Sequence, residues 1–362
     1  MKTYAGIPIK NLWLLMLYAS DLKLTQVRQA IQYLDTPYIH DSLVAWLIQC
    51  LEQYLKQPQQ HYIPKQQALA YIRGKVDIQR SYLTHSLKQG QVHCQFAQLS
   101  FNSPEHQYLY AVIDKLLKHT KPEQHMVLKR CQRQLAQLGV QVIGRPLAPQ
   151  HVTHHALSEL LALADVLLNF KIPSTEDGQH VWQQPKEDLH WLRQLFERAI
   201  GGFYKKYLTQ GWRVLQGAVL RWPPVTQHMA LPQMKTDVIL THQDRRCILI
   251  DTKFTQIWTQ GYYRKQELFK SPHLYQLYTY LRSQEHATSR FNFTQGMLIY
   301  PSIGQTITAD LQLHDYWIGF YTLDLTQDQQ GIEQQLLSFI ESSRHIDCDH
   351  ISWPDTALDR LA

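Results

Sequence analysis

Cysteine is scarce in this 362-residue chain, and the five cysteines lie far apart. No two of them form a C-x-x-C pair, which argues against a disulfide framework and for reduced thiols in a cytoplasm. Cys348 and His350 lie close together near the C-terminus, but two isolated candidate ligands do not make a zinc site. The cysteine content therefore predicts a cytoplasmic protein without a structural zinc.

Long hydrophobic runs are also missing. The apolar run from Leu12 to Ala19 follows two lysines and is similar to the core of a short signal peptide, but it is too short to span a bilayer. Pro8 and Asn11, which precede this run, favour instead the start of a helix in a folded domain. No other segment approaches the length of a membrane span, so no membrane partner is expected.

A dense charge of one sign is absent as well. Charged residues make up 18% of the chain and apolar residues 44%, which is typical of a soluble globular protein. The net charge is +6, with 19 histidines besides. This mild positive excess suits a polyanionic partner but lacks the charge density of a histone-like binder.

The chain changes character near its middle. Residues 1–170 carry mostly helical patterns, with a strand-like portion within 71–83. The polar segment 171–188 contains two prolines and a glycine and is the best candidate boundary. We therefore expect a mostly helical α+β domain at 1–175 and a second domain at 186–362. The helical patterns of the first part lie near 11–20, 41–55, 104–118, 122–138 and 156–170.

The second part alternates helices and strands. Its patterns predict a helix over 187–208, strands over 212–222, 234–240 and 247–254, a helix over about 264–284, strands over 296–301 and 316–325, and a helix over 327–343. The second and third strands are expected to form an antiparallel hairpin or to lie adjacent in the sheet. This order predicts an α/β fold built on a mixed sheet flanked by helices.

The third of these strands ends in Asp251-Thr252-Lys253. Side chains two residues apart on a strand point to the same face, so Asp251 and Lys253 project together. A hairpin can bring Asp237 beside Asp251, and Mg²⁺ relieves the repulsion between two such carboxylates. Lys253 would then position, or help to deprotonate, a metal-bound water that attacks phosphorus. The alternative is a solvated strand end that carries no chemistry.

Two helical features extend this candidate site. Gln276 and Tyr280 lie one turn apart on the helix expected at 264–284, where Gln276 would bond near the scissile phosphate or the active-site backbone with Tyr280 supporting it. The alternative is an amphipathic helix whose tyrosines belong to the core. Glu197 flanks the apolar stripe of the helix at 187–208, and it either reaches the metal as a third carboxylate or pairs with a lysine or arginine.

These residues, in this order, resemble the PD-(D/E)XK nuclease superfamily, and the Q-x-x-x-Y element at 276–280 is similar to the branch that contains RecB-type nuclease domains. A broader resemblance is to McrC, the nuclease subunit of the McrBC modification-dependent restriction systems. Six segments carry it in order over about 300 residues: IPIKNLWLLMLYAS (7–20), LFERAIGGFYKKYL (195–208), MKTDVIL (234–240), ILIDTKF (248–254), HLYQLYTYL (273–281) and GMLIYP (296–301).

The resemblance implies a Mg²⁺-dependent DNA endonuclease subunit active in host defence. The domain at 186–362 would be the PD-(D/E)XK (restriction-endonuclease-like) domain, and the domain at 1–175 would engage the partner. The implied partners are double-stranded DNA, methylated in this family, and McrB, a GTP-hydrolysing AAA+ motor. The chain has no G-x-x-x-x-G-K-[ST] motif, so any nucleotide dependence has to come from that partner.

The resemblance also implies roles for single residues. Asp237 and Asp251 would be metal ligands, Lys253 the catalytic lysine, and Gln276 and Tyr280 the helical motif. The RecB-type G-x-x-x-H motif is not apparent upstream, so the ligand on the first helix, for which Glu197 is the candidate, stays open.

Basic and aromatic residues at 254–270 are expected to line the DNA path. Phosphate contacts are assigned to Arg264, Lys265 and Lys270, and contacts with sugar or motor to Tyr262 and Tyr263. The alternative is an ordinary solvated loop and helix start. Two other functions remain open from the sequence: a catalytically idle adaptor that stimulates the motor, and a stand-alone repair nuclease of the RecB type.

Overall fold

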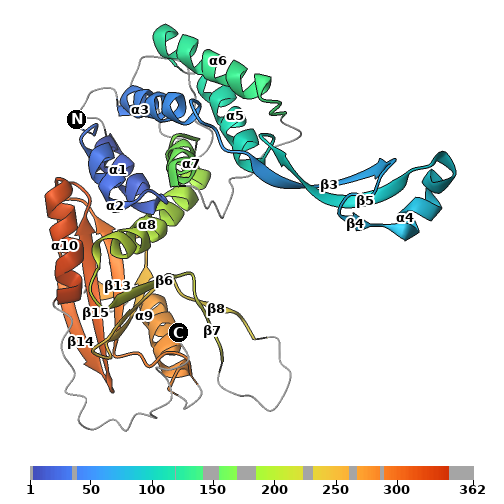
Figure 1. Ribbon diagram of the computed structural model, residues 1–362. Coiled ribbons are helices and arrows are strands. Elements are labelled where there is room, and N and C mark those ends of the chain that lie inside the picture. Colours follow the sequence, from blue (N-terminus) through green and yellow to red (C-terminus); the bar gives the residue numbers. More distant parts are fainter. Residues whose placement is uncertain are drawn as a thin grey trace. The chain divides into compact units, whose positions relative to one another are not determined.

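The computed structural model describes residues 3–34, 39–118, 120–141, 155–168, 185–222, 231–260, 267–285 and 289–341 (Figure 1). The chain divides into two compact units, of which the first combines Met1–Asp35 with Ile172–Ala362 and the second is Thr36–Lys171. Helices and strands occur in both units, so the expected α/β class is confirmed. Among the described helices, none combines the length and the apolar character that crossing a bilayer requires.

The first unit contains a six-stranded sheet and five helices within its described residues. Its helices are α1 (Ile9–Ala19), α2 (Leu24–Ile31), α8 (Pro185–Tyr207), α9 (Ser271–Ser283) and α10 (Gln329–Glu341). The sheet contains β6 (Trp212–Gln216), β9 (Val238–His242), β10 (Cys247–Thr252), β13 (Gln295–Ser302), β14 (Thr308–Leu313) and β15 (Tyr316–Asp324). Three two-stranded pairs join β1 (Thr3–Tyr4) to β2 (Ile7–Pro8), β7 (Val219–Leu220) to β8 (Met234–Lys235), and β11 (Trp258–Gln260) to β12 (Glu267–Phe269).

The expected mixed sheet is confirmed, with strand order β14-β15-β13-β10-β9-β6. The strands β10, β13 and β15 run parallel, while β14, β9 and β6 pair antiparallel with their neighbours. β10 lies in the interior of the sheet and is buried along its whole length. This burial explains its continuous apolar run before Asp251.

Helices cover both faces of the sheet (Figure 1). Phe320 of β15 belongs to the core cluster that α9 shares with Leu249 of β10. The next residue, Tyr321, points to the other face, where its ring stacks on Phe339 of α10 at a centroid distance of 4.8 Å. On that second face, Tyr204 of α8 donates a hydrogen bond to a backbone oxygen of α10. The site residues of β10 therefore lie in a sheet enclosed by α9 on one side and α8 with α10 on the other.

The N-terminal segment packs on the first unit, which differs from the expected domains at 1–175 and 186–362. The expected limits place residues 1–35 with the helical part of the chain. In the structure, α1 packs along α8, and Asn11 Nδ2 donates to the backbone oxygens of Leu325 and Gln327 at 2.7 and 2.8 Å. The two hydrogen bonds of Asn11 join residues more than 300 positions apart, which no local pattern reveals.

Two other expectations differ in detail. The helix expected from about 264 begins at Ser271, where Pro272 occupies its first turn, and residues 267–269 form strand β12 instead. The strand expected at 212–222 is split into β6 and β7 by Gly217, which has φ +63° and so interrupts a regular strand.

The second unit contains helices and a three-stranded sheet. Its helices are α3 (Ile39–Tyr54), α4 (Ile78–Leu83), α5 (Pro104–Leu116), α6 (Pro122–Gln137) and α7 (His155–Leu168), with a 3₁₀ turn η1 (Ser86–Gln89). β3 (His61–Leu69) and β5 (Val92–Ser100) form a long antiparallel pair that also holds β4 (Lys75–Val76).

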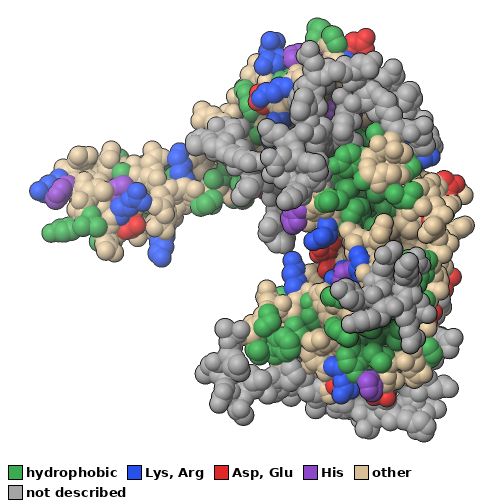
Figure 2. Space-filling model, turned by 180° about the vertical axis from the view of Figure 1, so that it is seen from behind, with side chains coloured by type: hydrophobic (Ala, Val, Ile, Leu, Met, Phe, Trp, Pro, Cys, Tyr) green, Lys and Arg blue, Asp and Glu red, His purple; other side chains and the backbone are tan. Residues whose placement is uncertain are grey.

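Residues 61–100 form an arm that extends from the helices of their own unit (Figure 1). Lysine, arginine and histidine side chains lie on its surface beside apolar ones (Figure 2). The most exposed apolar side chains of the arm are Tyr62, Tyr71, Ile72, Ile78, Tyr82 and Leu83. The strand-like pattern expected within 71–83 contains β4 and then α4, because the Asp77 side chain accepts from the Arg80 N–H and starts a helix there.

Candidate active site

The candidate active site lies at the end of β10. Asp251 is 2% exposed, and its Oδ2 lies 2.7 Å from Nζ of Lys253. The Lys253 N–H donates to the Ile299 backbone oxygen at 2.9 Å, so β13 still holds the chain at this residue. The two side chains that the alternation of the strand predicts to project together form an ion pair. This strand end is buried and is not a solvated terminus.

The β9–β10 pairing brings Asp237 to the same place. Ile250 pairs with Val238, so the next step of this antiparallel register sets Asp251 opposite Asp237. Asp237 Oδ2 accepts hydrogen bonds from the N–H and the Oγ1 of Thr252, both at 2.7 Å. The hairpin expected from the sequence is therefore present, and its register unites the two acids.

The Asp251 carboxyl group is in an unfavourable environment for its charge. Burial first, and the Asp237 carboxylate second, raise the pKa of Asp251 to about 7 against the opposing effect of Lys253. Among the described residues, the Lys253 ammonium is the one polar contact of the Asp251 carboxylate. A second cation near these oxygens would favour the ionised form.

Gln276 and Tyr280 of α9 are linked to this ion pair by hydrogen bonds. Lys253 Nζ donates to Gln276 Oε1 at 2.8 Å, and Gln276 Nε2 donates to the Tyr280 hydroxyl at 2.9 Å. Tyr280 is 9% exposed and also packs in the core cluster beneath α9. The helix thus fixes the lysine through a glutamine that is itself fixed by a tyrosine.

Glu197 approaches the site from α8. Burial first, and then the charge of Asp237, raise the pKa of Glu197, while Lys235 and Lys253 act in the opposite direction. Within the described part of the chain, its carboxylate forms no ion pair with a lysine or arginine. Glu197 therefore lies in the electrostatic field of Asp237 and of the lysines of the site.

The carboxylates can be tested for their fit to a metal ion. Within residues 3–341 that are described, no group of three or more His, Cys, Asp or Glu side chains could hold a metal ion. Mg²⁺, however, is usually bound by one or two carboxylates, with waters and substrate phosphate as further ligands. The opposed pair Asp237 and Asp251, with the under-satisfied Asp251 carboxylate, fits that ligand set.

Two further residues lie at this site and were not predicted from the sequence, His273 and Tyr300. His273 Nδ1 lies 3.1 Å from the Tyr300 hydroxyl. Burial first, and then the charges of Lys253, Lys270 and Arg193, lower the pKa of His273 to about 4. His273 precedes Gln276 by three residues, so a reading of the same helical face would have found it. Tyr300 lies on β13, and nothing in the local sequence links it to the site.

The predicted DNA-contacting residues divide into two groups. Lys270 is described, and its Nζ donates to the Thr255 hydroxyl at 2.7 Å. Arg264 and Lys265 lie outside the described residues, as do Tyr262 and Tyr263.

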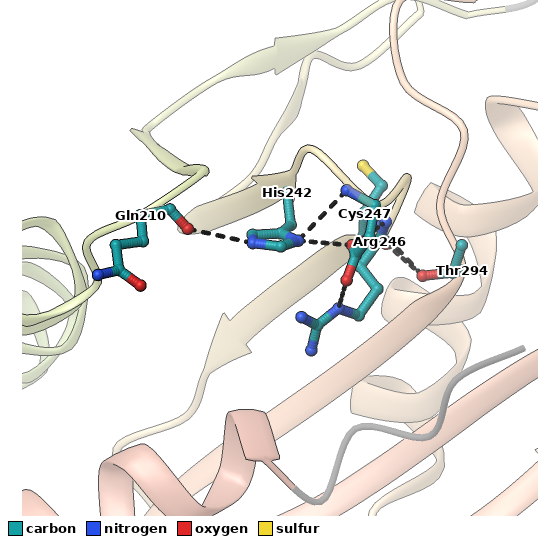
Figure 3. Close-up of polar contacts among 6 residues, drawn as sticks. Gln210, His242, Arg246, Cys247 and Thr294 are labelled. Atoms are coloured by element: carbon teal, nitrogen blue, oxygen red, sulfur yellow. Dashed lines mark hydrogen bonds and ion pairs between the residues drawn. The ribbon is translucent and has the colours of Figure 1, made fainter.

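A second polar cluster fixes the opposite end of the β9–β10 hairpin (Figure 3). The Arg246 backbone N–H and Nε donate to the Asp244 carboxylate at 3.1 and 2.8 Å, and His242 Nδ1 lies 2.7 Å from the same group. The Cys247 N–H donates to Thr294 Oγ1 at 3.2 Å, which ties the hairpin to the start of β13. This cluster contains no predicted site residue, but it helps to set the register of the two site acids.

Comparisons with known proteins identify relatives that cover most of the chain. The family model described as McrBC 5-methylcytosine restriction system component matches residues 6–301. The type IV methyl-directed restriction enzyme EcoKMcrBC of Escherichia coli strain K12 is 21% identical over 350 residues, which cover 92% of this chain and 97% of that protein. A solved half-complex of Thermococcus gammatolerans McrB AAA+ hexamers with bound McrC aligns with a TM-score of 0.44 and 15% identity over 92% of this chain and 76% of that chain.

Proposed function

Since this chain belongs to the family of McrBC 5-methylcytosine restriction system components, we propose that it is the DNA endonuclease subunit of such a system, active in host defence. The proposed reaction is Mg²⁺-dependent hydrolysis of DNA phosphodiesters by the first unit. As part of this proposal we assign the six-stranded sheet and its helices to the PD-(D/E)XK fold, with Asp237 and Asp251-Thr252-Lys253 as its motif.

The position of the Lys253 ammonium is the observation that carries the proposal. Nζ lies 2.7 Å from Asp251 Oδ2 and 2.8 Å from Gln276 Oε1, so two oxygens on different elements fix it. A lysine held in this way can orient a water molecule for attack on phosphorus. Asp237 and Asp251 would hold Mg²⁺, which when bound stabilises the negative charge that develops on the phosphate.

The remaining site residues hold Lys253 and Asp237 in position. Gln276 orients the lysine, and the Tyr280 hydroxyl orients the glutamine amide by accepting from its Nε2 at 2.9 Å. Thr252 holds the Asp237 carboxylate in place through two hydrogen bonds. Glu197 is proposed to act on the site through its charge and not as a third ligand of the ion, because no three acids of the described residues could hold a metal together.

The proposed partners follow from the family. We propose that the chain acts on methylated double-stranded DNA together with a GTP-hydrolysing AAA+ subunit, in the cytoplasm. The chain has no phosphate-binding G-x-x-x-x-G-K-[ST] motif of its own, so GTP hydrolysis is assigned to that partner. Lys270, with Arg264 and Lys265, is proposed to contact DNA phosphates.

The test is a plasmid cleavage assay with Mg²⁺, in the presence and absence of the AAA+ subunit and GTP, on plasmid with and without 5-methylcytosine. We expect Asp251→Ala and Lys253→Ala to lower the rate of cutting by at least about 100-fold, because each removes a group that acts on the reacting phosphate or water. Size-exclusion chromatography should show that both variants still assemble with the AAA+ subunit.

Matched controls show whether a loss of cutting is specific to the site residues or follows from any change of charge. Asp315→Ala and Lys205→Ala remove an exposed acid and an exposed lysine of the same unit away from the site, and both should cut as wild type does. Cutting that survives Asp251→Ala or Lys253→Ala would refute the proposal. A wild-type chain that stimulates GTP hydrolysis but cuts neither plasmid would be an adaptor. A wild-type chain that cuts unmethylated DNA in the absence of the AAA+ subunit would be a stand-alone nuclease.

A further inference from the structure

Within the described residues, two cations beside the candidate active site form no ion pair with an acid. Lys270 lies directly before α9, and its Nζ donates to Thr255, two residues beyond Lys253. Arg193 is exposed on α8 one turn before Glu197, so both side chains lie on one face of the helix. The ion pairs of the described residues include neither Arg193 nor Lys270. Their charges are therefore available to an anionic ligand.

The pKa of His273 responds to both of these charges. After burial, the three effects that lower the pKa of His273 are the charges of Lys253, Lys270 and Arg193. The ring therefore lies within the field of cations that follow β10, precede α9 and lie on α8. With a pKa of about 4, the ring is neutral near pH 7.

The Tyr300 hydroxyl fixes the orientation of this ring. It lies 3.1 Å from His273 Nδ1, and Tyr300 itself is fully buried, with its pKa raised by burial and by Asp251. A protonated tyrosine can donate to Nδ1, and this leaves the imidazole hydrogen on Nε2. In that tautomer, His273 presents a neutral N–H donor among the cations.

We propose that Arg193, Lys270 and His273 form a binding site for the DNA backbone phosphate next to the one that is cut. This inference rests on the proposed function, because it supposes that DNA occupies the site. Arg193 and Lys270 would neutralise the phosphate, while the His273 Nε2–H would donate to one of its oxygens without adding charge. Such a contact would hold the strand in register with Lys253, so these three residues position the substrate.

The test measures binding of a fluorescein-labelled DNA duplex to the full chain by fluorescence anisotropy, in EDTA and over a series of salt concentrations. We expect Arg193→Gln and Lys270→Gln each to lower the slope of log affinity against log salt by about 1, since each removes one phosphate contact. His273→Asn should weaken binding about 5- to 10-fold at every salt concentration with the slope unchanged, because the ring is a neutral donor.

Arg213→Gln is the matched control, since Arg213 is an exposed arginine of the same unit on β6, near the far end of the β9–β10 hairpin. It should bind DNA as wild type does, and thermal unfolding should show that every variant is folded. The proposal is overturned if Arg193→Gln and Lys270→Gln behave like Arg213→Gln, if His273→Asn binds as wild type does, or if the wild type shows no DNA binding at low salt.

Because this assay contains no metal ion, its result does not depend on cutting. Binding changes as expected from a chain that never cuts would refute the nuclease and leave the phosphate site standing. Cutting that is normal in all three variants, with unchanged binding, would refute the phosphate site alone.

Discussion

At the scale of single residues, the site depends on a carboxyl group whose charge the fold disfavours. Burial and the Asp237 charge raise the pKa of Asp251 to about 7, whereas an ordinary aspartate has 3.8. A pKa raised by folding contributes stability that is fully present below the unfolded pKa and is lost as the pH rises through the folded one. Ionised Asp251 therefore destabilises the protein above pH 7.

A substitution at Asp251 tests this conclusion. Without Mg²⁺, Asp251→Asn should be more stable than wild type at pH 8, because the amide does not ionise, and its advantage should shrink by about 2–3 kcal/mol when the pH falls to 5. Thermal unfolding followed by circular dichroism at both pH values measures the difference. Asp315→Asn, at an exposed turn, is the control for the removal of one acid. A wild type that is the more stable of the two at pH 8 would contradict the assignment.

At the scale of elements, α1 is held against α8 by a close approach at one glycine. A Cβ at Gly202 would lie 2.1 Å from the Tyr18 backbone oxygen, so no larger residue fits while the helices keep this distance. Lys206, one turn later, donates to the backbone oxygens of Tyr18 and Ser20 at 2.9 and 2.6 Å and so satisfies carbonyls at the end of α1. The α1 contact is therefore specific and depends on both the glycine and the lysine.

Gly202→Ala should destabilise the protein by about 1–3 kcal/mol, because the added methyl group forces the two helices apart. Chemical unfolding gives the free energy, and hydrogen exchange should show faster exchange in α1. Gly331→Ala in α10 is the control, since a Cβ there comes no closer than 3.1 Å to flexible side chains. The control should be neutral or stabilising, by up to about 1 kcal/mol from helix propensity. Equal effects of the two substitutions would show that the close approach of α1 and α8 at Gly202 does not determine the loss of stability.

At the scale of the whole molecule, one of the two compact units is discontinuous in the sequence. The first unit takes its residues from both ends of the chain, and the second is inserted between them. Leu12 and Tyr18 of the N-terminal segment are fully buried, and the Tyr18 hydroxyl donates to Glu333 of α10 at 2.8 Å. Removing residues 1–35 would therefore expose an apolar face of the first unit.

Fragments of the chain test this arrangement. Residues 36–171 should fold alone with a cooperative thermal transition, since they form a compact unit. Residues 172–362 should melt at a lower temperature than the first unit does in the full chain. Addition of a peptide of residues 1–35 should raise the melting temperature of this fragment again. Circular dichroism and calorimetry measure both. A fragment of residues 172–362 that is as stable as the full chain would contradict the packing of α1 described above.

The sequence predicted those contacts of the site that arise within one helix, one strand or one hairpin. Alternation along β10 predicted that Asp251 and Lys253 share a face, and the polar turn before it predicted the hairpin that brings Asp237 opposite. Helical spacing predicted that Gln276 and Tyr280 interact. Periods of two and 3.6 residues are fixed by the backbone itself, so neighbours within one element or one hairpin follow from them.

By itself, then, the sequence determined the α/β class, the hairpin and the motif residues of the site. Only the tertiary structure decided that residues 1–35 belong to the first unit, that Lys253 meets Gln276, and that His273 joins Tyr300 from another strand. Those contacts join segments that fold side by side while lying far apart in the chain. The packing of helices on a sheet depends on shapes, close approaches and buried hydrogen bonds, and no repeating pattern in the sequence records them.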